Sequence, residues 1–313
     1  MLDVLIVNYN TARLLKPMFD ALEAAADGLE VRYWVIDNAS RDDSVNVLRE
    51  QFPKAGLDVN TVNVGFGRAN NQLLKHVRGQ YVLLLNTDAF VEPDTLRKTL
   101  AYMDSHSGCG VLGVKLLSRD GTIQPSCRFF LTPWNVFLSR TGLARFLPKL
   151  RMVDDPNWDP DQEQECDWVP GCYYLIRREV IDRVGLFDSR YFLYCEEVDH
   201  CKRVKEAGWK VVYYPGTSVV HLGGESAKSD SDLTAGNQIS SLQVESELLY
   251  FRKHYGLVGM LKHIALTTFG SVYQLLKILV KGGGWTVARP SLNYFLQTWS
   301  LLYRTLFGTR ATR

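Results

Sequence analysis

The stretch YVLLLNTD, from Tyr81 to Asp88, decides the fold of this chain, because five apolar residues are followed directly by three polar ones. An apolar run of this length predicts a strand that is buried on both faces. Comparable runs precede it, and helical patterns separate them. The runs are Val4–Val7, Tyr33–Ile36 and Leu57–Val62, and the helical patterns are Thr11–Ala26, Asp42–Gln51, Gly67–His76 and Pro93–Met103. This alternation predicts an α/β fold with a Rossmann-like, mainly parallel central sheet flanked by helices.

The composition is that of a folded protein, and it narrows the range of partners. At 313 residues and 46% hydrophobic composition, the chain can bury a large core. Its 36 Lys and Arg residues nearly balance its 34 Asp and Glu residues, so we expect no nucleic-acid binding through bulk charge. The six cysteines form no CxxC pair, and no secretion signal precedes the first apolar run. We therefore expect reduced thiols and a cytoplasmic location.

The alternating pattern changes after Gly110. We expect hairpin strands around Asp120-Gly121, a long irregular stretch from Thr132 to Asp167, and a helix from Glu196 to Ala207. Long irregular segments in compact domains usually carry function, so this part of the chain is expected to contribute to a site.

After Ser240 the chain is predicted to be helical and amphipathic. From Met260 to Phe307, apolar and aromatic residues are interspersed with Lys and Arg. The least charged piece, Ile264–Leu276, is too short to cross a bilayer, so we expect two helices at a membrane surface, joined by a hinge at Gly282–Gly284. The alternative is a helical extension that packs on the rest of the chain or on a second copy in an oligomer.

Polar residues follow four of the predicted strands, at the point where each strand ends. The four clusters are Asn8-Tyr9-Asn10-Thr11, Asp37-Asn38-Ala39-Ser40, Asn63–Asn71 and Asn86-Thr87-Asp88. In an open α/β sheet, ligands bind at the carboxyl ends of the strands. Four clusters on one edge therefore predict a nucleotide-binding cleft, although Asn10, Thr11 and Ser40 taken singly could instead cap helices.

Several of these residues suit the parts of a nucleotide. Asp37 can accept a hydrogen bond from the imide of a uracil or thymine ring, with Asn38 as a neighbouring amide. Gly65 and Gly67 permit a close approach of the backbone to a ligand. Arg68 and the N-terminus of the helix that follows favour a diphosphate.

Other side chains suit metal binding and proton transfer. Asp88 directly follows a strand and can hold Mg²⁺ or Mn²⁺ beside phosphate oxygens. His221 leaves a strand into glycines and is a second candidate ligand, although a lone histidine is more often structural. Glu196, Glu197 and Asp199 crowd the start of one predicted helix. Helix capping explains one or two of these carboxylates, and another can take the proton of an attacking hydroxyl.

Together these clusters resemble the family 2 glycosyltransferases with the GT-A fold, in particular the rhamnosyltransferase-like and galactofuranosyltransferase-like members. The resemblance covers roughly residues 2–225, and the segments that carry it follow one another in the family's order. They are Val7–Asn10, Asp37–Ser40, Asn63–Asn71, Asn86–Asp88, Trp168–Cys172, Arg177-Arg178, Phe187-Asp188 and the acidic motif from Glu196. The sequence departs from the family's pattern in two motifs that are expected to take part in the reaction. Asn86 replaces the first acid of the Asp-x-Asp motif, and Glu196-Glu197 replaces the usual Glu-Asp of the acidic motif.

The resemblance implies an inverting, metal-dependent glycosyltransferase and assigns roles by position. Glu197 matches the base, with Glu196 beside it and Asp199 orienting or capping, and Asp88 and His221 match the ligands of Mg²⁺ or Mn²⁺. The acceptor side is expected at Trp168, Gly171 and Cys172. The nucleotide-sugar side is expected at Asn8, Tyr9, Asn10, Asp37, Asn38, Asn63, Gly65, Gly67, Arg68, Asn70, Asn86 and Thr87.

The resemblance also predicts the domains and the substrates. Residues 1–240 are expected to form the GT-A catalytic domain, with a nucleotide-sugar half at 1–108 and an acceptor half at 109–240, and residues 241–313 a helical extension. The expected donor is dTDP-L-rhamnose, or otherwise another UDP- or dTDP-sugar. The expected acceptor is a lipid-linked or cell-surface glycan, met at the inner face of the cell membrane.

Two other functions remain open at this stage. A sugar nucleotidyltransferase also combines an α/β sheet, a nucleotide and a carboxylate-bound metal, but it normally has a glycine-rich basic loop after the first strand, and Asn8–Thr11 offers none. A non-catalytic subunit that binds a nucleotide sugar or acts as a scaffold would keep the fold without needing Asp88, Glu197 and His221.

Overall fold

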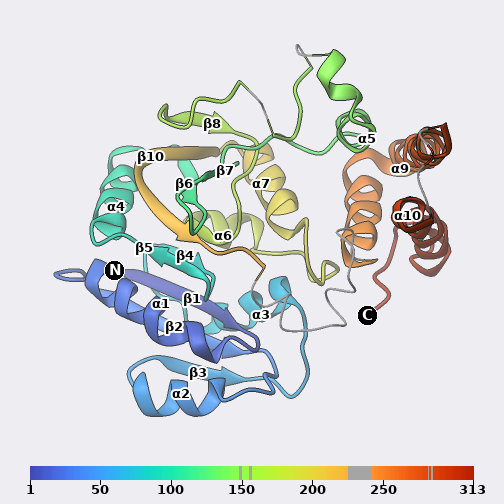
Figure 1. Cartoon of the computed structure of the whole chain (residues 1–313). Helices are drawn as coiled ribbons and strands as arrows, with labels where there is room; N and C mark the ends of the chain where they lie inside the picture. The colour runs from blue at the N-terminus through green and yellow to red at the C-terminus, as the bar shows by residue number, and fades with distance from the viewer. Residues whose placement is uncertain (148–149, 155–156, 225–240, 281, 283–284) are drawn as a thin grey trace. The chain divides into compact units, whose positions relative to one another are not determined.

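The computed structural model describes residues 1–147, 150–154, 157–224, 241–280, 282 and 285–313 (Figure 1). The chain divides into two compact units. Unit 1 comprises Met1–Arg128, Asn157–Ser189 and Glu196–Asp232, and unit 2 comprises Phe129–Pro156, Arg190–Cys195 and Leu233–Arg313. Two segments that precede residue 240 are thus grouped with the C-terminal helices, whereas every residue expected at the site belongs to unit 1.

Unit 1 is built on one sheet, in which the described residues form ten strands in the order β3-β2-β1-β4-β9-β6-β10-β5, with β7 beside β6 and β8 beside β10. The strands are β1 (Leu2–Asn8), β2 (Val31–Asp37), β3 (Gly56–Val59), β4 (Tyr81–Leu85), β5 (Ala89–Val91), β6 (Cys109–Leu117), β7 (Ile123–Gln124), β8 (Gln164–Cys166), β9 (Tyr173–Arg177) and β10 (Lys210–His221). β1 and β2 pair from Leu2 with Val31 to Asn8 with Asp37. The first two polar clusters therefore begin side by side.

The predicted parallel arrangement is confirmed for β3, β2, β1 and β4. The other half of the sheet is mixed, since β9 runs antiparallel to both β4 and β6. β10 runs parallel to β6 and antiparallel to β5. Strand β10 thereby returns a late part of the chain to the segment that directly follows Asp88.

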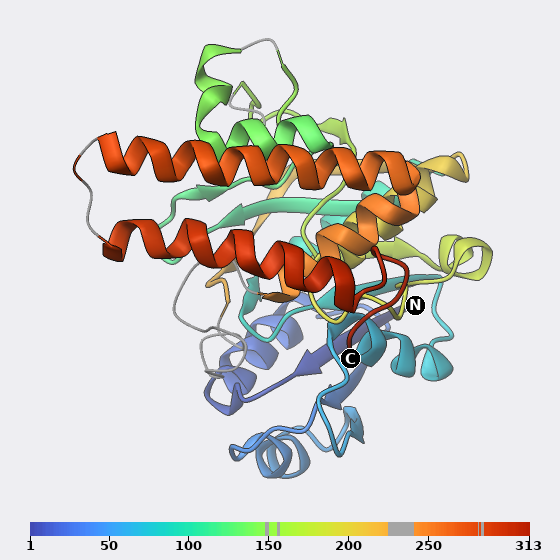
Figure 2. The same cartoon turned by 90° about the vertical axis from the view of Figure 1, so that its right-hand side faces the viewer.

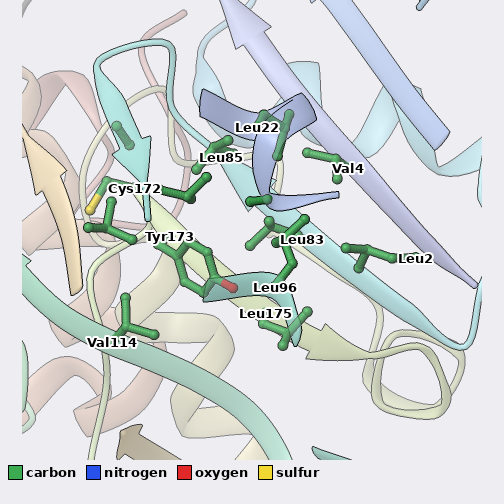
Figure 3. Packing of buried hydrophobic residues seen from close by; sticks show 14 of the residues in the cluster. Leu2, Val4, Leu22, Leu83, Leu85, Leu96, Val114, Cys172, Tyr173 and Leu175 are labelled. Atoms are coloured by element: carbon green, nitrogen blue, oxygen red, sulfur yellow. The ribbon is translucent and has the colours of Figure 1, made fainter. Parts of the chain in front are cut away.

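Helices cover both faces of this sheet. They are α1 (Ala12–Ala25), α2 (Ser44–Gln51), α3 (Phe66–Leu73), the 3₁₀ turn η1 (Leu74–His76), α4 (Thr95–Ser105), α6 (Arg178–Val184) and α7 (Glu196–Glu206). Figure 3 shows one face of the core, where Leu83 of β4 and Tyr173 of β9 gather with Leu22 of α1 and Leu96 of α4. The Tyr173 hydroxyl lies 2.8 Å from that of Thr99 in α4, so the buried phenol keeps a hydrogen bond.

Tyr174, the next residue of β9, points to the opposite face because side chains alternate along a strand. Its hydroxyl lies 2.8 Å from Nδ1 of His200 in α7. Helix α7, which carries the acidic cluster, is thereby fixed to the face opposite α1 and α4.

Unit 2 contains the helices α5 (Pro133–Thr141), α9 (Ser241–Val280) and α10 (Trp285–Arg304), and the 3₁₀ turn η2 (Leu143–Phe146). Figure 2 shows α5 and α10 alongside α9, which bends where Gly256 interrupts it with a φ of 67°. The predicted C-terminal helices are confirmed; of the predicted hinge, Gly282 lies between α9 and α10, and Gly283 and Gly284 lie outside the described residues. Arg140 of α5 donates to both oxygens of the buried Glu247 of α9 at 3.0 Å, which ties these two helices together.

After Gly256, the side of α9 that is exposed to solvent is rich in large apolar side chains. Besides Leu257, seven large apolar side chains are exposed there, and these seven are here called the α9 stripe: Val258, Leu261, Phe269, Val272, Leu276, Leu279 and Val280. The buried residues include the polar His263, Thr267 and Ser271. An amphipathic helix in water usually has the opposite arrangement. α9 is also long and apolar enough to cross a membrane by length and composition, with 28% of its most apolar window buried.

Candidate active site

The ends of β1 and β2 are joined by side-chain hydrogen bonds. Asn8 Nδ2 donates to Asp37 Oδ1 at 2.7 Å and to Ser40 Oγ at 3.1 Å. The backbone N–H of Ser40 donates to the other oxygen of Asp37 at 2.9 Å. Both carboxylate oxygens thus accept bonds from the chain itself, and Asp37 is 1% exposed. The observed contacts of Asp37 order this edge of the sheet, and its contact with a nucleobase stays a prediction.

The helix-capping alternative is wrong for Asn10, Thr11 and Ser40. Thr11 stands before α1 without a side-chain cap, and its hydroxyl donates instead to Asn8 Oδ1 at 2.7 Å. Ser40 lies before Asp43, the residue that actually precedes α2, and its Oγ accepts from the backbone N–H of Asn10 at 2.9 Å. These polar residues therefore form hydrogen bonds between the loops at the ends of β1 and β2.

Asn38 holds the loop that leads from β3 into α3. Its Nδ2 donates to Asn63 Oδ1 at 2.8 Å, and its Oδ1 accepts from Asn60 Nδ2 at 3.0 Å and from the backbone N–H of Val64 at 3.1 Å. Asn63 Oδ1 also accepts from the backbone N–H of Gly65 at 2.9 Å. Asn38 is 2% exposed, whereas Asn63 is partly exposed. Of this pair, Asn63 is the more accessible to a ligand.

The start of α3 lies against the start of α7. Gly65 precedes α3 with a φ of 90°, a conformation that favours glycine. A Cβ on Gly67 would lie a tight 3.2 Å from the Cβ of Phe187 and an ordinary 3.7 Å from that of Glu196, so the missing side chain leaves room for Phe187. Arg68 is partly exposed, and its Nε donates to the carbonyl of Ser189 at 2.6 Å.

Asn70, one turn further along α3, is turned inward. It is 1% exposed, and its Nδ2 donates to the carbonyl of Phe66 at 3.1 Å. Tyr9, by contrast with the fully enclosed Asn8, is 9% exposed at the end of β1. A direct contact of Asn70 with a ligand remains a prediction that this burial does not favour.

Asp88 and His221 are brought together by the pairing of β5 with β10. His221 pairs with Ala89, and the backbone N–H of Leu222 donates to the carbonyl of Asp88 at 3.0 Å. His221 Nε2 then lies 3.5 Å from Asp88 Oδ1. Burial lowers the pKa of His221 below its ordinary value, and the charge of Asp88 opposes that shift. A largely neutral ring facing a carboxylate is a suitable pair of metal ligands.

This pair fits a divalent cation geometrically. Two adjacent ligands of octahedral Mg²⁺ at about 2.1 Å lie about 3 Å apart, close to the 3.5 Å separation of Nε2 and Oδ1. The described residues contain no group of three or more His, Cys, Asp or Glu side chains that could hold a metal. Substrate oxygens and water would therefore have to complete the coordination, as is usual for Mg²⁺ at phosphates.

Asn86 and Thr87 differ in how far they are accessible. The Thr87 hydroxyl lies 2.9 Å from that of Thr11 and is buried, whereas the Asn86 side chain is partly exposed. The backbone N–H of Asn86 donates to the carbonyl of Cys172 at 3.0 Å. Burial raises the pKa of the Cys172 thiol, and the carboxylates of Asp88 and Glu197 raise it further.

The other residues expected on the acceptor side surround Cys172. Trp168 is 6% exposed and is covered by the guanidinium of Arg128, 4.4 Å from its ring centre. Gly171 is partly exposed, and a Cβ there would meet the ring of Phe66 at an ordinary 3.7 Å. Among these three residues, Gly171 is the most accessible to an acceptor.

The acidic cluster at the start of α7 is divided by burial. Glu196 is 3% exposed, and its Oε2 has no hydrogen-bond partner among the described residues. Burial raises the pKa of Glu196 well above its ordinary value, and the charge of Glu197 raises it further. Glu197 is partly exposed; burial raises its pKa too, whereas Arg128 lowers it. Asp199 is fully buried, and its Oδ2 accepts from Arg203 Nε at 2.9 Å.

Strained backbone lies beside these clusters. Asn10 and Ala39, just after β1 and β2, have φ values of 52° and 68°, and Tyr194 and Cys195, just before α7, have values of 74° and 67°. A residue other than glycine in this region typically costs about 1–3 kcal/mol, and such strain concentrates at functional sites. Asn10 and Ala39 therefore mark the same edge of unit 1 as the polar side chains, whereas Tyr194 and Cys195 are grouped with unit 2.

Several residues of this region were missed by the sequence reasoning. Gln124, which contacts His221, belongs to a two-residue strand that lacks any recognisable motif. Asn60, a polar residue between β3 and α3, bonds to Asn38. Arg203 could have been found, since an Asp and an Arg four residues apart on a helix are expected to pair.

Residues 3–150 match the sequence model of the family described as Glycosyl transferase family 2. The chain carries a family 2 glycosyltransferase domain. This glycosyltransferase is 27% identical to N-acetylglucosaminyl-diphospho-decaprenol L-rhamnosyltransferase of Mycobacterium tuberculosis over 247 residues, which cover 73% of this chain and 78% of that protein. It is 26% identical to Rhamnosyltransferase WbbL of Escherichia coli K12 over 238 residues, which cover 71% of this chain and 83% of that protein.

A solved structure also resembles this glycosyltransferase. The crystal structure of residues 1–349 of Staphylococcus aureus TarS matches with a TM-score of 0.51 at 15% identity, covering 97% of this chain and 91% of that one. At this identity the match shows the fold alone. The predicted GT-A glycosyltransferase fold is therefore confirmed, together with the resemblance to rhamnosyltransferases.

Proposed function

We propose that this glycosyltransferase transfers L-rhamnose from dTDP-L-rhamnose to a lipid-linked glycan acceptor, with inversion at the anomeric carbon and with the help of Mg²⁺ or Mn²⁺. The observation that carries the proposal is the approach of Asp88 and His221 to 3.5 Å where β5 pairs with β10. The names of the mycobacterial and Escherichia coli relatives support rhamnose as the transferred sugar. The mycobacterial name also supports a lipid diphosphate acceptor.

The donor is proposed to bind along the ends of β1, β2 and β4. Asn10, Asn63, Arg68 and Asn86 are the partly exposed members of the predicted set and are assigned direct contacts. The buried members, among them Asn8, Asp37, Asn38, Asn70 and Thr87, hold the loops that carry these contacts. TarS, whose fold is similar at a TM-score of 0.50, has been crystallised with UDP, which supports a nucleotide in such a fold.

Glu197 is proposed to be the base. It is more accessible than Glu196, and its raised pKa brings a carboxylate closer to the range in which it can accept a proton from a hydroxyl. A bound Mg²⁺ or Mn²⁺ supplies charge stabilisation to the departing diphosphate. Asp88 and His221 would hold the ion, Arg68 and the N-terminus of α3 would contact the phosphates, and Gly171 would border the acceptor hydroxyl. A single displacement by that hydroxyl inverts the configuration.

The remaining proposals concern location. Residues 1–240 are proposed as the catalytic domain, with halves at 1–108 and 109–240, and residues 241–313 as the extension that meets a membrane surface. The α9 stripe supports this, because seven large apolar side chains face outward while polar ones face inward. A lipid-linked acceptor would be met at such a surface, on the cytoplasmic side.

The test is a screen of the purified full-length protein against dTDP-L-rhamnose and several UDP-sugars, with Mn²⁺, Mg²⁺ or EDTA. We expect a metal-dependent rise in melting temperature and slow donor hydrolysis with dTDP-L-rhamnose. Asp88→Ala should abolish both, whereas Asp20→Ala, a substitution at an exposed aspartate of α1, should abolish neither. NMR of the transferred product should show the anomeric configuration opposite to that of the donor. A stronger response to a UDP-sugar, or one that EDTA leaves unchanged, would overturn the proposed donor or the metal.

A further inference from the structure

Gln124 is fixed beside His221 by three hydrogen bonds. Its Nε2 donates to the backbone carbonyl of His221 at 2.8 Å and to Ser118 Oγ at 3.1 Å. Its Oε1 lies 3.0 Å from Nδ1 of the His221 ring. The amide of Gln124 thus contacts both the backbone and the ring of His221.

The partners of Gln124 determine which way its amide points. A backbone carbonyl is only an acceptor, so the amide nitrogen must face the carbonyl of His221 and the amide oxygen must face its ring. An amide oxygen is likewise only an acceptor, so Nδ1 of His221 must carry the proton in this contact. In a neutral ring the other nitrogen, Nε2, then presents a lone pair.

That lone pair faces the carboxylate of Asp88. Nε2 lies 3.5 Å from Asp88 Oδ1, too long for a good hydrogen bond and suited to two ligands of one cation. The opposite tautomer would put a proton on Nε2 and set the Nδ1 lone pair against the oxygen of Gln124, two acceptors 3.0 Å apart. The amide of Gln124 is incompatible with that arrangement.

We propose that Gln124 is a positioning residue that holds His221 as the Nδ1–H tautomer, so that Nε2 and Asp88 together form the divalent-cation site. The inference rests on the proposed metal dependence and adds a residue to it. Metal-bound histidines generally donate their second N–H to a partner that orients the ring, and loss of that partner typically weakens metal binding about 10- to 100-fold. Gln124 is neutral, so it orients the ring without adding charge to the site.

The first test is the tautomer of His221 in the metal-free wild-type protein. Long-range ¹H–¹⁵N NMR of histidine-labelled protein distinguishes protonated from unprotonated ring nitrogens, and the His221 signals are assigned by their loss in His221→Gln. We expect Nδ1 protonated and Nε2 unprotonated at neutral pH. A ring protonated at Nε2, alone or together with Nδ1, would overturn the inference.

The second test is the affinity for Mn²⁺ alone, measured by the loss of the free-ion EPR signal. Gln124→Met removes the amide at similar size, and we expect Mn²⁺ binding to weaken about 10- to 100-fold. Gln162→Met, at an exposed glutamine of unit 1, should bind like the wild type. Equal affinities in both variants would contradict the inference, and if Gln124→Met fails to fold, the wild-type tautomer decides alone.

The two tests separate this inference from the proposed function. A wild-type protein that binds no Mn²⁺ in the presence or absence of donor refutes the metal-dependent mechanism, and with it a cation site at Asp88 and His221. A wild-type protein that binds Mn²⁺ normally but shows the Nε2–H tautomer refutes only the role of Gln124.

Discussion

Glu196 and Glu197 are neighbours in sequence, but the start of α7 gives them different surroundings. Glu196 is 3% exposed with an unpartnered oxygen, whereas Glu197 is partly exposed. Position in the acidic motif favoured Glu197 as the base, but the sequence could not show that the two side chains differ in burial, because both stand at the first turn of one helix. Their different burial in the folded protein makes the difference.

The two glutamates are predicted to differ in catalysis. Glu197→Gln removes the proposed base and should lower kcat about 10²- to 10⁴-fold, the usual contribution of a positioned base. Glu196→Gln keeps the shape of the buried side chain and should lower kcat less than about tenfold. The measurement is the steady-state transfer rate at saturating donor for both variants. A larger loss in Glu196→Gln would move the base to that residue.

Glu196 is also predicted to make stability depend on pH. Its pKa is raised in the folded protein, so its favourable contribution is complete below the pKa of the unfolded chain, about 4.3, and is lost as pH rises through the folded value. From pH 5 to pH 8, the unfolding free energy of the wild type should therefore fall relative to that of Glu196→Gln. Urea unfolding at both pH values measures it, with Glu206→Gln, at the exposed end of α7, as the matched control. A difference that does not change with pH would contradict the prediction.

Helix α7 also shows what Asp199 does in this structure. Asp199 pairs with Arg203, whose guanidinium donates to the carbonyls of Val184 and Leu186 just before Phe187. Phe187 is held in turn by Asn71 of α3, which donates to its carbonyl at 2.7 Å and accepts from its N–H at 3.1 Å. The chain of contacts from α7 to α3 places the acidic cluster beside the proposed donor site.

The pair Asp199–Arg203 is predicted to stabilise the fold rather than to act on substrate. Asp199→Asn removes the charge of a fully buried carboxylate and leaves the partly exposed guanidinium of Arg203 with a weaker partner, so the loss of stability should be about 3 kcal/mol. The double variant Asp199→Asn, Arg203→Met should lose less unfolding free energy than the two single variants lose in sum. Both substitutions remove the same interaction, so its loss is counted only once. Urea unfolding of all three variants gives the coupling. A fully stable Asp199→Asn protein with lost transfer activity would show instead that Asp199 belongs to the chemistry.

The elements of the first hundred residues were largely predictable. The run Tyr81–Leu85 is strand β4 as predicted, and the predicted helix Asp42–Gln51 ends at the same residue as α2, Gln51. The predicted strand Leu57–Val62 ends earlier, at Val59, because the chain there turns to reach Asn38. The place of β9 between β4 and β6 could not be predicted, since local periodicity says nothing about which distant strands pair.

At the scale of the whole molecule, the polar strand ends were predicted correctly as a group but not in detail. Sequence position shows that Asn8, Asp37 and Asn38 lie at one edge of the sheet. It does not show that they bond to one another and are enclosed. The grouping of residues 129–156 with the C-terminal helices was equally hidden, because it depends on contacts such as that of Arg140 with Glu247.

The α9 stripe leads to a prediction about the entire protein. Replacing two of its exposed residues, Phe269→Asp with Leu276→Asp, should reduce binding of the full-length protein to vesicles of mixed anionic lipids, because each charge opposes burial in lipid. Flotation of protein with vesicles measures the bound fraction. Val62→Asp, on an equally exposed valine of unit 1, is the control and should leave binding unchanged. Undiminished flotation of the double variant would exclude the stripe as the membrane contact.

The pairing of β5 with β10 has a consequence for synthesis on the ribosome. Asp88 is translated early, but its partner strand ends at His221 and must be inserted between β6 and β5. A nascent chain therefore contains Asp88 long before His221 has been synthesised. A chain that stops short of β10 also leaves the edges of β6 and β5 that β10 would pair with open. Such edges favour aggregation. The proposed cation site can therefore form only once translation has passed β10.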